Sequence, residues 1–198
     1  MVTPTFDISD SSRIRSIRTA RAARTDGECL RYRLDVVAAS AADAVHSAGG
    51  WLYDRAMAGW EVTVLLPQSC DSRPLRILGV KAMDLEAGFG RTGSATHKTH
   101  SLAVSAKVFA ADDRIRATVL KALNHGLTEV ALWGEGWPLA DNRGMAWVQH
   151  VLSSAARTFK GHALAAAGIS CGTVDPTEAM LYDMAACSPA DLDRVRLG

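Results

Sequence analysis

The amino-acid sequence predicts an α/β fold with a doubly wound, mainly parallel sheet of about five strands (Rossmann-like), an N-terminal arm and a helical C-terminus. Three observations predict it. Short apolar segments typical of buried strands alternate with segments of helical periodicity. Glycines stand where several of these helices would end. The connection 67–79, between two of the strands, is about as long as a parallel crossover requires.

The composition is typical of a globular protein. Of 198 residues, 48% are apolar and 22% charged, and the net charge of +1 gives the whole molecule no attraction for polyanions. Arginine far outnumbers lysine and alanine is abundant, a bias typical of GC-rich coding, as in actinobacteria. The four cysteines form no C-x-x-C, no apolar leader precedes the domain, and no window approaches a membrane span. We therefore expect a cytoplasmic protein that does not contact a membrane.

The sequence divides into two parts. Residues 1–28 are polar and contain five arginines between 13 and 24, so we expect a basic N-terminal arm or docking helix there. Residues 29–198 are predicted to form a single α/β domain, because strand and helix patterns alternate through them.

The domain opens with a strand, a helix and a second strand. Residues 30–38 alternate in polarity, as a strand does. The segment from Ser40 has helical spacing and reaches Gly59, a helix stop. Residues 61–66, EVTVLL, form a continuous apolar run typical of a strand buried on both faces of a parallel sheet.

Residues 71–85 resemble one long strand, but residues typical of helix starts and helix ends within them favour two elements. Ser72 suits an N-cap, Pro74 suits the first helical turn, and Gly79 suits the position after a helix end. These residues predict a short helix over 72–78 and then a strand over 80–85.

The second half continues the alternation. Residues 101–109 alternate as a strand, and a helix capped by Asp112 or Asp113 ends at Gly126. A strand over 127–133 and a loop over 134–143 follow. The remaining predicted elements are helices at about 144–166, 176–186 and 189–196.

Ligands of such sheets bind beyond the carboxyl ends of the strands. The loop 134–143 has the most unusual composition at that edge, because Trp137 stands among charged residues and aromatic platforms bind rings, sugars or partner side chains. Alternatively, Trp137 closes the core. The predicted ligand-binding residues are Ser40, Asp43, Arg73, Glu135, Trp137, Asp141 and Arg143.

Two tempting motifs lack the context that their chemistry needs. Gly88, Gly90 and Gly93 form G-x-G-x-x-G, but they follow the third strand and open into no helix, so we interpret them as part of a polar loop. His97 and His100 are three apart with no cluster of acidic or cysteine residues beside them. We therefore expect no metal and no cofactor.

Residues 36–66 carry a family resemblance. Ala-Gly-Gly at 48–50, Ala-Gly before the second strand and Val-Thr-Val at 62–64 resemble the opening of the LmbE-like (PIG-L) N-acetylglucosaminyl deacetylases. The resemblance implies a zinc-binding His-Pro-Asp-Asp between strand and helix, with the first His and second Asp as ligands and the first Asp as base. The matching residues here are Ser40, Ala41, Ala42 and Asp43, which keep one acidic residue and lack the base.

Two main functions remain open. The leading hypothesis is a non-catalytic module that binds a protein partner or a small molecule at the carboxyl edge, because no complete catalytic set is recognisable. The alternative is an enzyme of unrecognised type, a hydrolase or transferase, that uses carboxylates of that edge, namely Asp43, Glu135 and Asp141. Nucleic-acid binding through the arginine-rich arm is possible but not favoured, because no aromatic residues interleave with the arginines.

Overall fold

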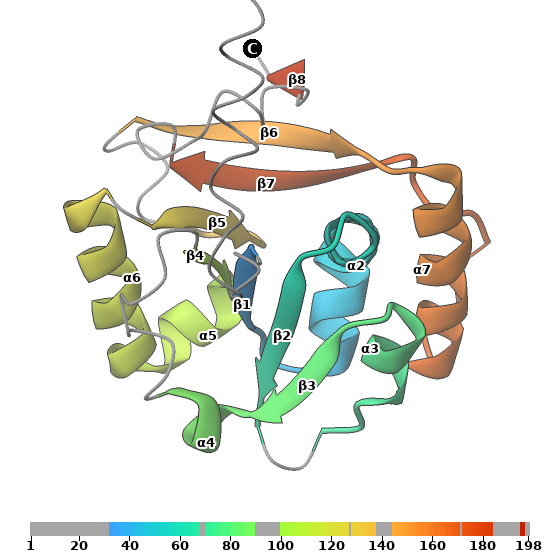
Figure 1. Cartoon of the computed structure of the whole chain (residues 1–198), viewed down its shortest axis with the longest axis horizontal. Coiled ribbons are helices and arrows are strands. Elements are labelled where there is room, and N and C mark those ends of the chain that lie inside the picture. The colour runs from blue at the N-terminus through green and yellow to red at the C-terminus, as the bar shows by residue number, and fades with distance from the viewer. Residues whose placement is uncertain are drawn as a thin grey trace, which may run out of the picture. The chain divides into compact units, whose positions relative to one another are not determined.

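The structure is a computed structural model, shown in Figure 1. By internal contacts the chain divides into Met1–Leu30 and Arg31–Gly198, and only the second unit contains described residues. Those residues are 32–67, 70–89, 100–126, 128–137, 144–170, 172–183 and 195–196. The predicted arm at 1–28 lies outside them.

The opening strand, helix and strand form as predicted. Strand β1 (Arg33–Val37) leads to helix α2 (Ala41–Met57) and then to strand β2 (Glu61–Leu66), which pairs with β1 in parallel. The Oγ atom of Ser40 accepts a hydrogen bond from the backbone N–H of Asp43 at 3.1 Å and so caps α2. After the helix, Gly59 has a φ of +89°, a left-handed conformation that favours glycine.

The short helix and strand that follow are also confirmed. Helix α3 (Arg73–Ile77) has Pro74 in its first turn, and strand β3 (Lys81–Asp84) adds to β2 in parallel. Helix α4 (Leu85–Phe89) comes next and was not predicted. A Cβ on its Gly88 would lie 2.4 Å from the Leu65 side chain, so this glycine of the G-x-G-x-x-G pattern serves close packing.

The predicted strand over 101–109 is wrong in its second half. Strand β4 (His100–Ser105) ends at Ser105, whose Oγ accepts from the backbone N–H of Lys107 and starts helix α5 (Ala106–Ala111). Apolar residues at 108 and 109 fit either a strand or a helix, and burial against the core decides for the helix. Helix α6 (Asp113–His125) forms as predicted, between the cap Asp112 and Gly126.

The prediction is also wrong after strand β5 (Glu129–Trp133), which itself is confirmed. The first part of the predicted helix 144–166 is strand β6 (Met145–Val151), and only its second part is helical, as α7 (Ser154–Ala166). The predicted helix 176–186 is strand β7 (Thr177–Asp183). β6 and β7 pair along their whole length, and these non-local hydrogen bonds outweigh the local helical spacing.

The predicted helical C-terminus is therefore wrong in the described part. Of the last predicted helix, 189–196, only Val195–Arg196 is described, and it is strand β8.

The strands form one mixed sheet in the order β3-β2-β1-β4-β5-β7-β6-β8. The five strands from β3 to β5 are parallel, as predicted, and β7, β6 and β8 extend the sheet by antiparallel pairing. The sheet is thus mostly parallel and larger than predicted.

Helices lie on both faces of the sheet (Figure 1). Helices α2, α3 and α7 bury their apolar side chains in one core with Leu34, Val36 and Trp133. Helices α5 and α6 bury theirs in a second core with Val37, Leu132 and Trp137. None of the described helices combines the length and the apolar character needed to cross a membrane.

The common edge predicted for the loops is confirmed where it is described. β4 separates β1 from β5 and pairs with both in parallel, so residues 38–43 and 134–137 follow strands that end at the same edge. This edge positions the site.

Candidate functional site

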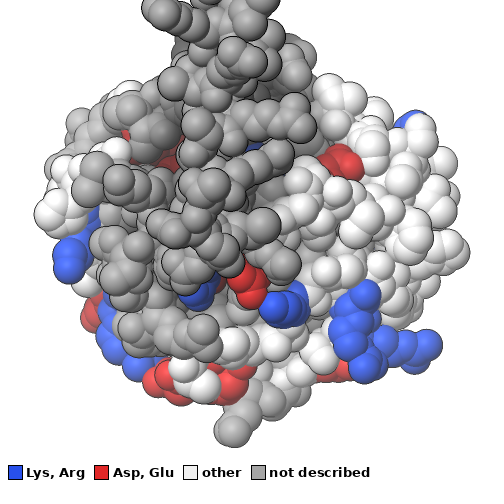
Figure 2. Space-filling model, viewed as in Figure 1, with Lys and Arg blue, Asp and Glu red and all other residues white. Residues whose placement is uncertain are grey.

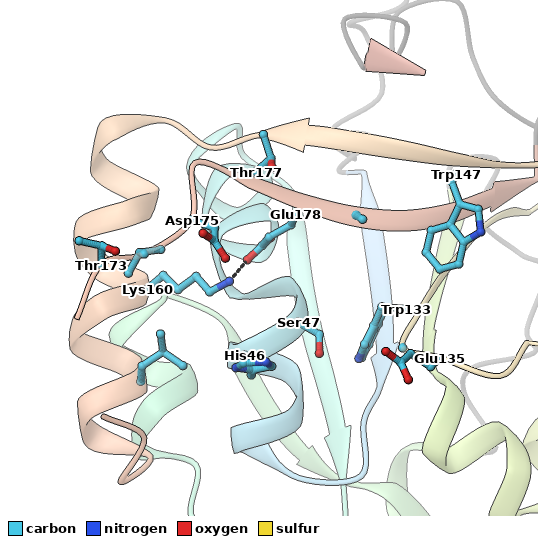
Figure 3. Close-up of a pocket in the computed structure, with 14 residues that line it drawn as sticks. His46, Ser47, Trp133, Glu135, Trp147, Lys160, Thr173, Asp175, Thr177 and Glu178 are labelled. Atoms are coloured by element: carbon cyan, nitrogen blue, oxygen red, sulfur yellow. Dashed lines mark hydrogen bonds and ion pairs between the residues drawn. The ribbon is translucent and has the colours of Figure 1, made fainter. Parts of the chain in front are cut away.

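A cleft of about 350 Å³ opens at the carboxyl edge, between α2, α7, the end of β5 and the start of β7 (Figure 3). β7 runs antiparallel to β5, and so its first residues extend past the end of β5 and form one wall. The lining side chains that carry chemistry are His46, Ser47, Trp133, Glu135, Trp147 and Asp175.

One wall is closed by a buried ion pair. Lys160 on α7 donates to Glu178 Oε1 on β7 at 2.6 Å, and both side chains are buried. Glu178 also accepts from the backbone N–H groups of Gly50 and Trp51 on α2, at 2.9 and 2.8 Å. The pair is neutral as a whole and its oxygens are occupied, so it is a structural wall of the cleft.

Trp133 forms the floor of the cleft. Its side chain is 1% exposed, yet its indole Nε1 has no hydrogen-bond partner among the described residues. Figure 3 shows this nitrogen between the side chains of Ser47 and Glu135. A buried N–H without a partner costs free energy, so the cleft contains a donor that lacks an acceptor.

Titratable groups line the same cleft. His46 is exposed in the second turn of α2, and Asp175 is exposed just before β7. Glu135 is exposed between Gly134 and Gly136, whose φ values of +94° and +79° shape the turn after β5. The cleft thus combines an imidazole and two carboxylates, the groups that most often transfer protons in catalysis.

The structure separates the predicted site residues. Glu135 lines the cleft, whereas Ser40 caps α2 and lines a different hollow beside Cys70. Arg73 is exposed at the start of α3. Asp141 and Arg143 lie outside the described residues.

Trp137 packs in the core. Its ring lies 4.8 Å from that of Phe109, centroid to centroid, and its Nε1 donates to the backbone oxygen of Trp133 at 3.2 Å. Trp137 therefore supports the end of β5 from the side of the second core.

Asp43 does not offer the zinc site that the family resemblance implies. One carboxylate oxygen is paired with Lys107 Nζ at 3.2 Å, and the other accepts from the backbone N–H of Ala39 at 3.3 Å. A cation thus already occupies the position next to the single remaining ligand. No three His, Cys, Asp or Glu side chains of the described residues gather as a metal site. The residues present do not fit the family's zinc ion.

Sequence reasoning did not single out His46, Trp133, Trp147 or Asp175. Asp175 comes directly before the predicted helix 176–186. Only the pairing of β7 with β5 brings these residues together. If residues 176–186 formed the predicted helix, the wall of the cleft that the start of β7 forms would be absent.

The charged side chains outside the cleft are mixed. On the face shown in Figure 2, acidic and basic side chains of the described residues alternate around the rim and form no continuous basic surface.

Among known proteins, solved structures of deacetylases resemble this chain. The sequence matches no protein-family model and no curated protein. Among solved structures, a deacetylase triple mutant of the teicoplanin biosynthetic pathway is similar, with a TM-score of 0.50 at 15% identity over 83% of this chain and 98% of that chain. A deacetylase–teicoplanin complex gives 0.49 at 13% identity over 84% and 99%. The A40926 pseudoaglycone deacetylase gives 0.48 at 15% identity over 68% and 81%.

The similarity concerns the fold, and at this level it confirms the resemblance to the LmbE-like deacetylases seen in residues 36–66. It also corrects our leading functional hypothesis. The similar structure is that of a deacetylase, an enzyme, which contradicts the expected non-catalytic module and agrees better with the alternative of an enzyme.

Proposed function

We propose that this chain is a hydrolase that removes an acyl group from an amide, and that the reaction takes place in the cleft above Trp133. The fold shared with a deacetylase supports this class of reaction. The observation that carries the proposal is the gathering of Glu135, His46 and an unpartnered N–H donor around one hollow at the carboxyl edge.

The two titratable groups have complementary roles. The Glu135 carboxylate accepts a proton from a water molecule, whose oxygen attacks the acyl carbon. The C–N bond then breaks, and protonated His46 supplies a proton to the leaving nitrogen. The products are a carboxylic acid and an amine. No step is assigned to zinc, because the Asp43 region does not fit that ion.

The substitution Glu135→Gln tests this assignment. It keeps the shape of the side chain and removes the base, so we expect kcat for acetate release from N-acetylated amines to fall about 10²- to 10⁴-fold. Acetate is measured by proton NMR. The control is Glu86→Gln, an exposed carboxylate on α4 outside the cleft, which should leave the rate unchanged. Equal rates for the two variants contradict the proposal.

Other features remain proposals from the sequence. We propose a cytoplasmic location, because the cysteines suggest no disulfide framework. We also propose a small-molecule substrate, because a cleft of about 350 Å³ is within the range of small-molecule sites.

A further inference from the structure

The buried indole nitrogen of Trp133 is an unusual feature of the cleft. Two buried indole nitrogens lack a partner among the described residues, those of Trp51 and Trp133. Of these two residues only Trp133 lines the cleft. A buried donor without an acceptor is unfavourable, and one explanation is an acceptor that arrives with a ligand.

The charges of the cleft lining restrict which ligand group can accept a hydrogen bond from Trp133 Nε1. The charge of Lys160 is balanced by Glu178 at 2.6 Å, whereas Glu135 and Asp175 add two exposed carboxylates to the lining. A carboxylate or phosphate ligand would meet this negative lining and be repelled. The acceptor is therefore the oxygen of a neutral group.

The lining also contains an aromatic surface. Trp147 on β6 is half-buried and lines the same cleft as Trp133 (Figure 3). Such a ring favours an apolar or ring-shaped part of the ligand. Glu135 lies at the open side of the same cleft, exposed between two glycines in left-handed conformation.

We propose that the cleft binds neutral or cationic acyl compounds through a hydrogen bond from Trp133 Nε1 to the acyl carbonyl oxygen, with Trp147 against the apolar part of the ligand. This inference rests on the proposed function, because it assigns the group that holds the scissile carbonyl. Trp133 thus holds the acyl oxygen, and the carboxylates of Glu135 and Asp175 select against an anion.

The test is an NMR titration of the full chain labelled with ¹⁵N on its indole groups. Trp133→Phe identifies the Trp133 signal. The probes are N-acetylbenzylamine, benzylamine, which lacks the carbonyl, and phenylacetate, which is anionic. We expect only N-acetylbenzylamine to move the Trp133 indole proton downfield, and phenylacetate to bind at least about tenfold more weakly.

Trp51→Phe is the matched control, since it removes an equally unpartnered buried N–H outside the cleft. We expect Trp133→Phe to raise the Kd for N-acetylbenzylamine about five- to tenfold and Trp51→Phe to leave it within about twofold. If Trp133→Phe does not fold, Trp→Phe variants of the other four tryptophans assign the Trp133 signal by elimination, and the titration of the native chain decides.

Three results overturn the inference: no binding of N-acetylbenzylamine, binding that leaves the Trp133 signal in place, or phenylacetate that binds as tightly. Turnover measured in parallel separates the two proposals. Binding that moves the Trp133 signal without acetate release contradicts only the proposed function. Acetate release with an unmoved Trp133 signal contradicts only this inference.

Discussion

Among single residues, two adjacent glycines of α2 have different roles. A Cβ on Gly50 would lie 2.5 Å from both Cδ atoms of Leu152, which is buried, whereas a Cβ on Gly49 would meet nothing closer than 3.4 Å. Gly50 thus lets α2 approach the segment between β6 and α7. The Ala-Gly-Gly that suggested the family resemblance has a packing reason at its second glycine.

The substitution Gly50→Ala should therefore destabilise the chain. Forcing a methyl group against Leu152 is overpacking, and we expect the free energy of unfolding to fall by about 1–3 kcal/mol. Gly49→Ala has room for its methyl group and gains helix propensity, so its stability should stay equal or rise by up to about 1 kcal/mol. Urea denaturation followed by circular dichroism measures both. A Gly50→Ala variant as stable as Gly49→Ala would contradict this assignment.

At the scale of elements, one arginine connects two helices. Arg114 in α6 donates to both carboxylate oxygens of Glu86 in α4, at 2.9 and 2.7 Å, and to Asp112 at the start of its own helix. Hydrogen bonds from this guanidinium lower the pKa of Glu86 and of Asp112 below their usual values. All three side chains are at the surface, so salt screens the interaction.

We expect Arg114→Ala to raise the pKa of Glu86 and Asp112 toward their ordinary values. In the native chain both pKa values are depressed on folding, so these groups contribute stability that is present above about pH 4 and is lost as the pH falls through the folded pKa. The variant should therefore show a weaker loss of stability on acidification. Carbon-detected NMR titration of the carboxyl groups measures the pKa values.

Arg116→Ala is the control for this experiment. Arg116 pairs with Asp113 at 2.6 Å on the same helix, and it should leave the pKa of Glu86 unchanged. A Glu86 pKa that stays depressed in Arg114→Ala would contradict the link between α4 and α6.

The elements also show which local sequence signals are enough to predict a helix or a strand. Helical spacing, caps and stops within a segment predicted α2, α3 and α6, because Gly59, Pro74, Asp112 and Gly126 act on the backbone within a few residues. The residues 145–151 offer no such signal, and their apolar spacing fits a strand and a helix alike. Pairing with β7, which begins 26 residues after β6 ends, makes this segment a strand.

At the scale of the whole molecule, Glu178 connects the antiparallel extension to the helices on one face of the sheet. It lies on β7, pairs with Lys160 on α7 and accepts two backbone N–H groups of α2. One buried carboxylate therefore joins β7 to both α2 and α7. The cleft lies directly beside it.

We expect Glu178→Gln to lower the free energy of unfolding by about 3–5 kcal/mol, because it leaves the Lys160 charge buried without a partner. The amide also retains only one oxygen for the two N–H groups of α2. The double variant Glu178→Gln with Lys160→Met removes the unpaired buried charge, so it should regain part of the lost free energy of unfolding. Thermal and urea unfolding measure both. A double variant less stable than the single one would contradict the role of the pair.

The candidate site could be predicted only in part. Glu135 was identified because it follows a strand that ends at the carboxyl edge, and the structure places it in the cleft. The same rule selected Ser40 and Asp43, which serve the start of α2 instead. Their side chains accept hydrogen bonds from backbone N–H groups, and Asp43 also pairs with Lys107, which is distant in the sequence.

The sequence alone determined most of the parallel half of this protein: its five strands, the helices α2, α3 and α6, and the edge where the strands end. It did so because caps, stops and periodicity act within single segments and parallel strands share one direction. Only the tertiary structure decided that 145–151 and 177–183 are strands, because their ladder joins residues far apart in the chain. The pairing of β7 with β5 then creates the cleft, and with it the meeting of His46, Trp133, Glu135 and Asp175.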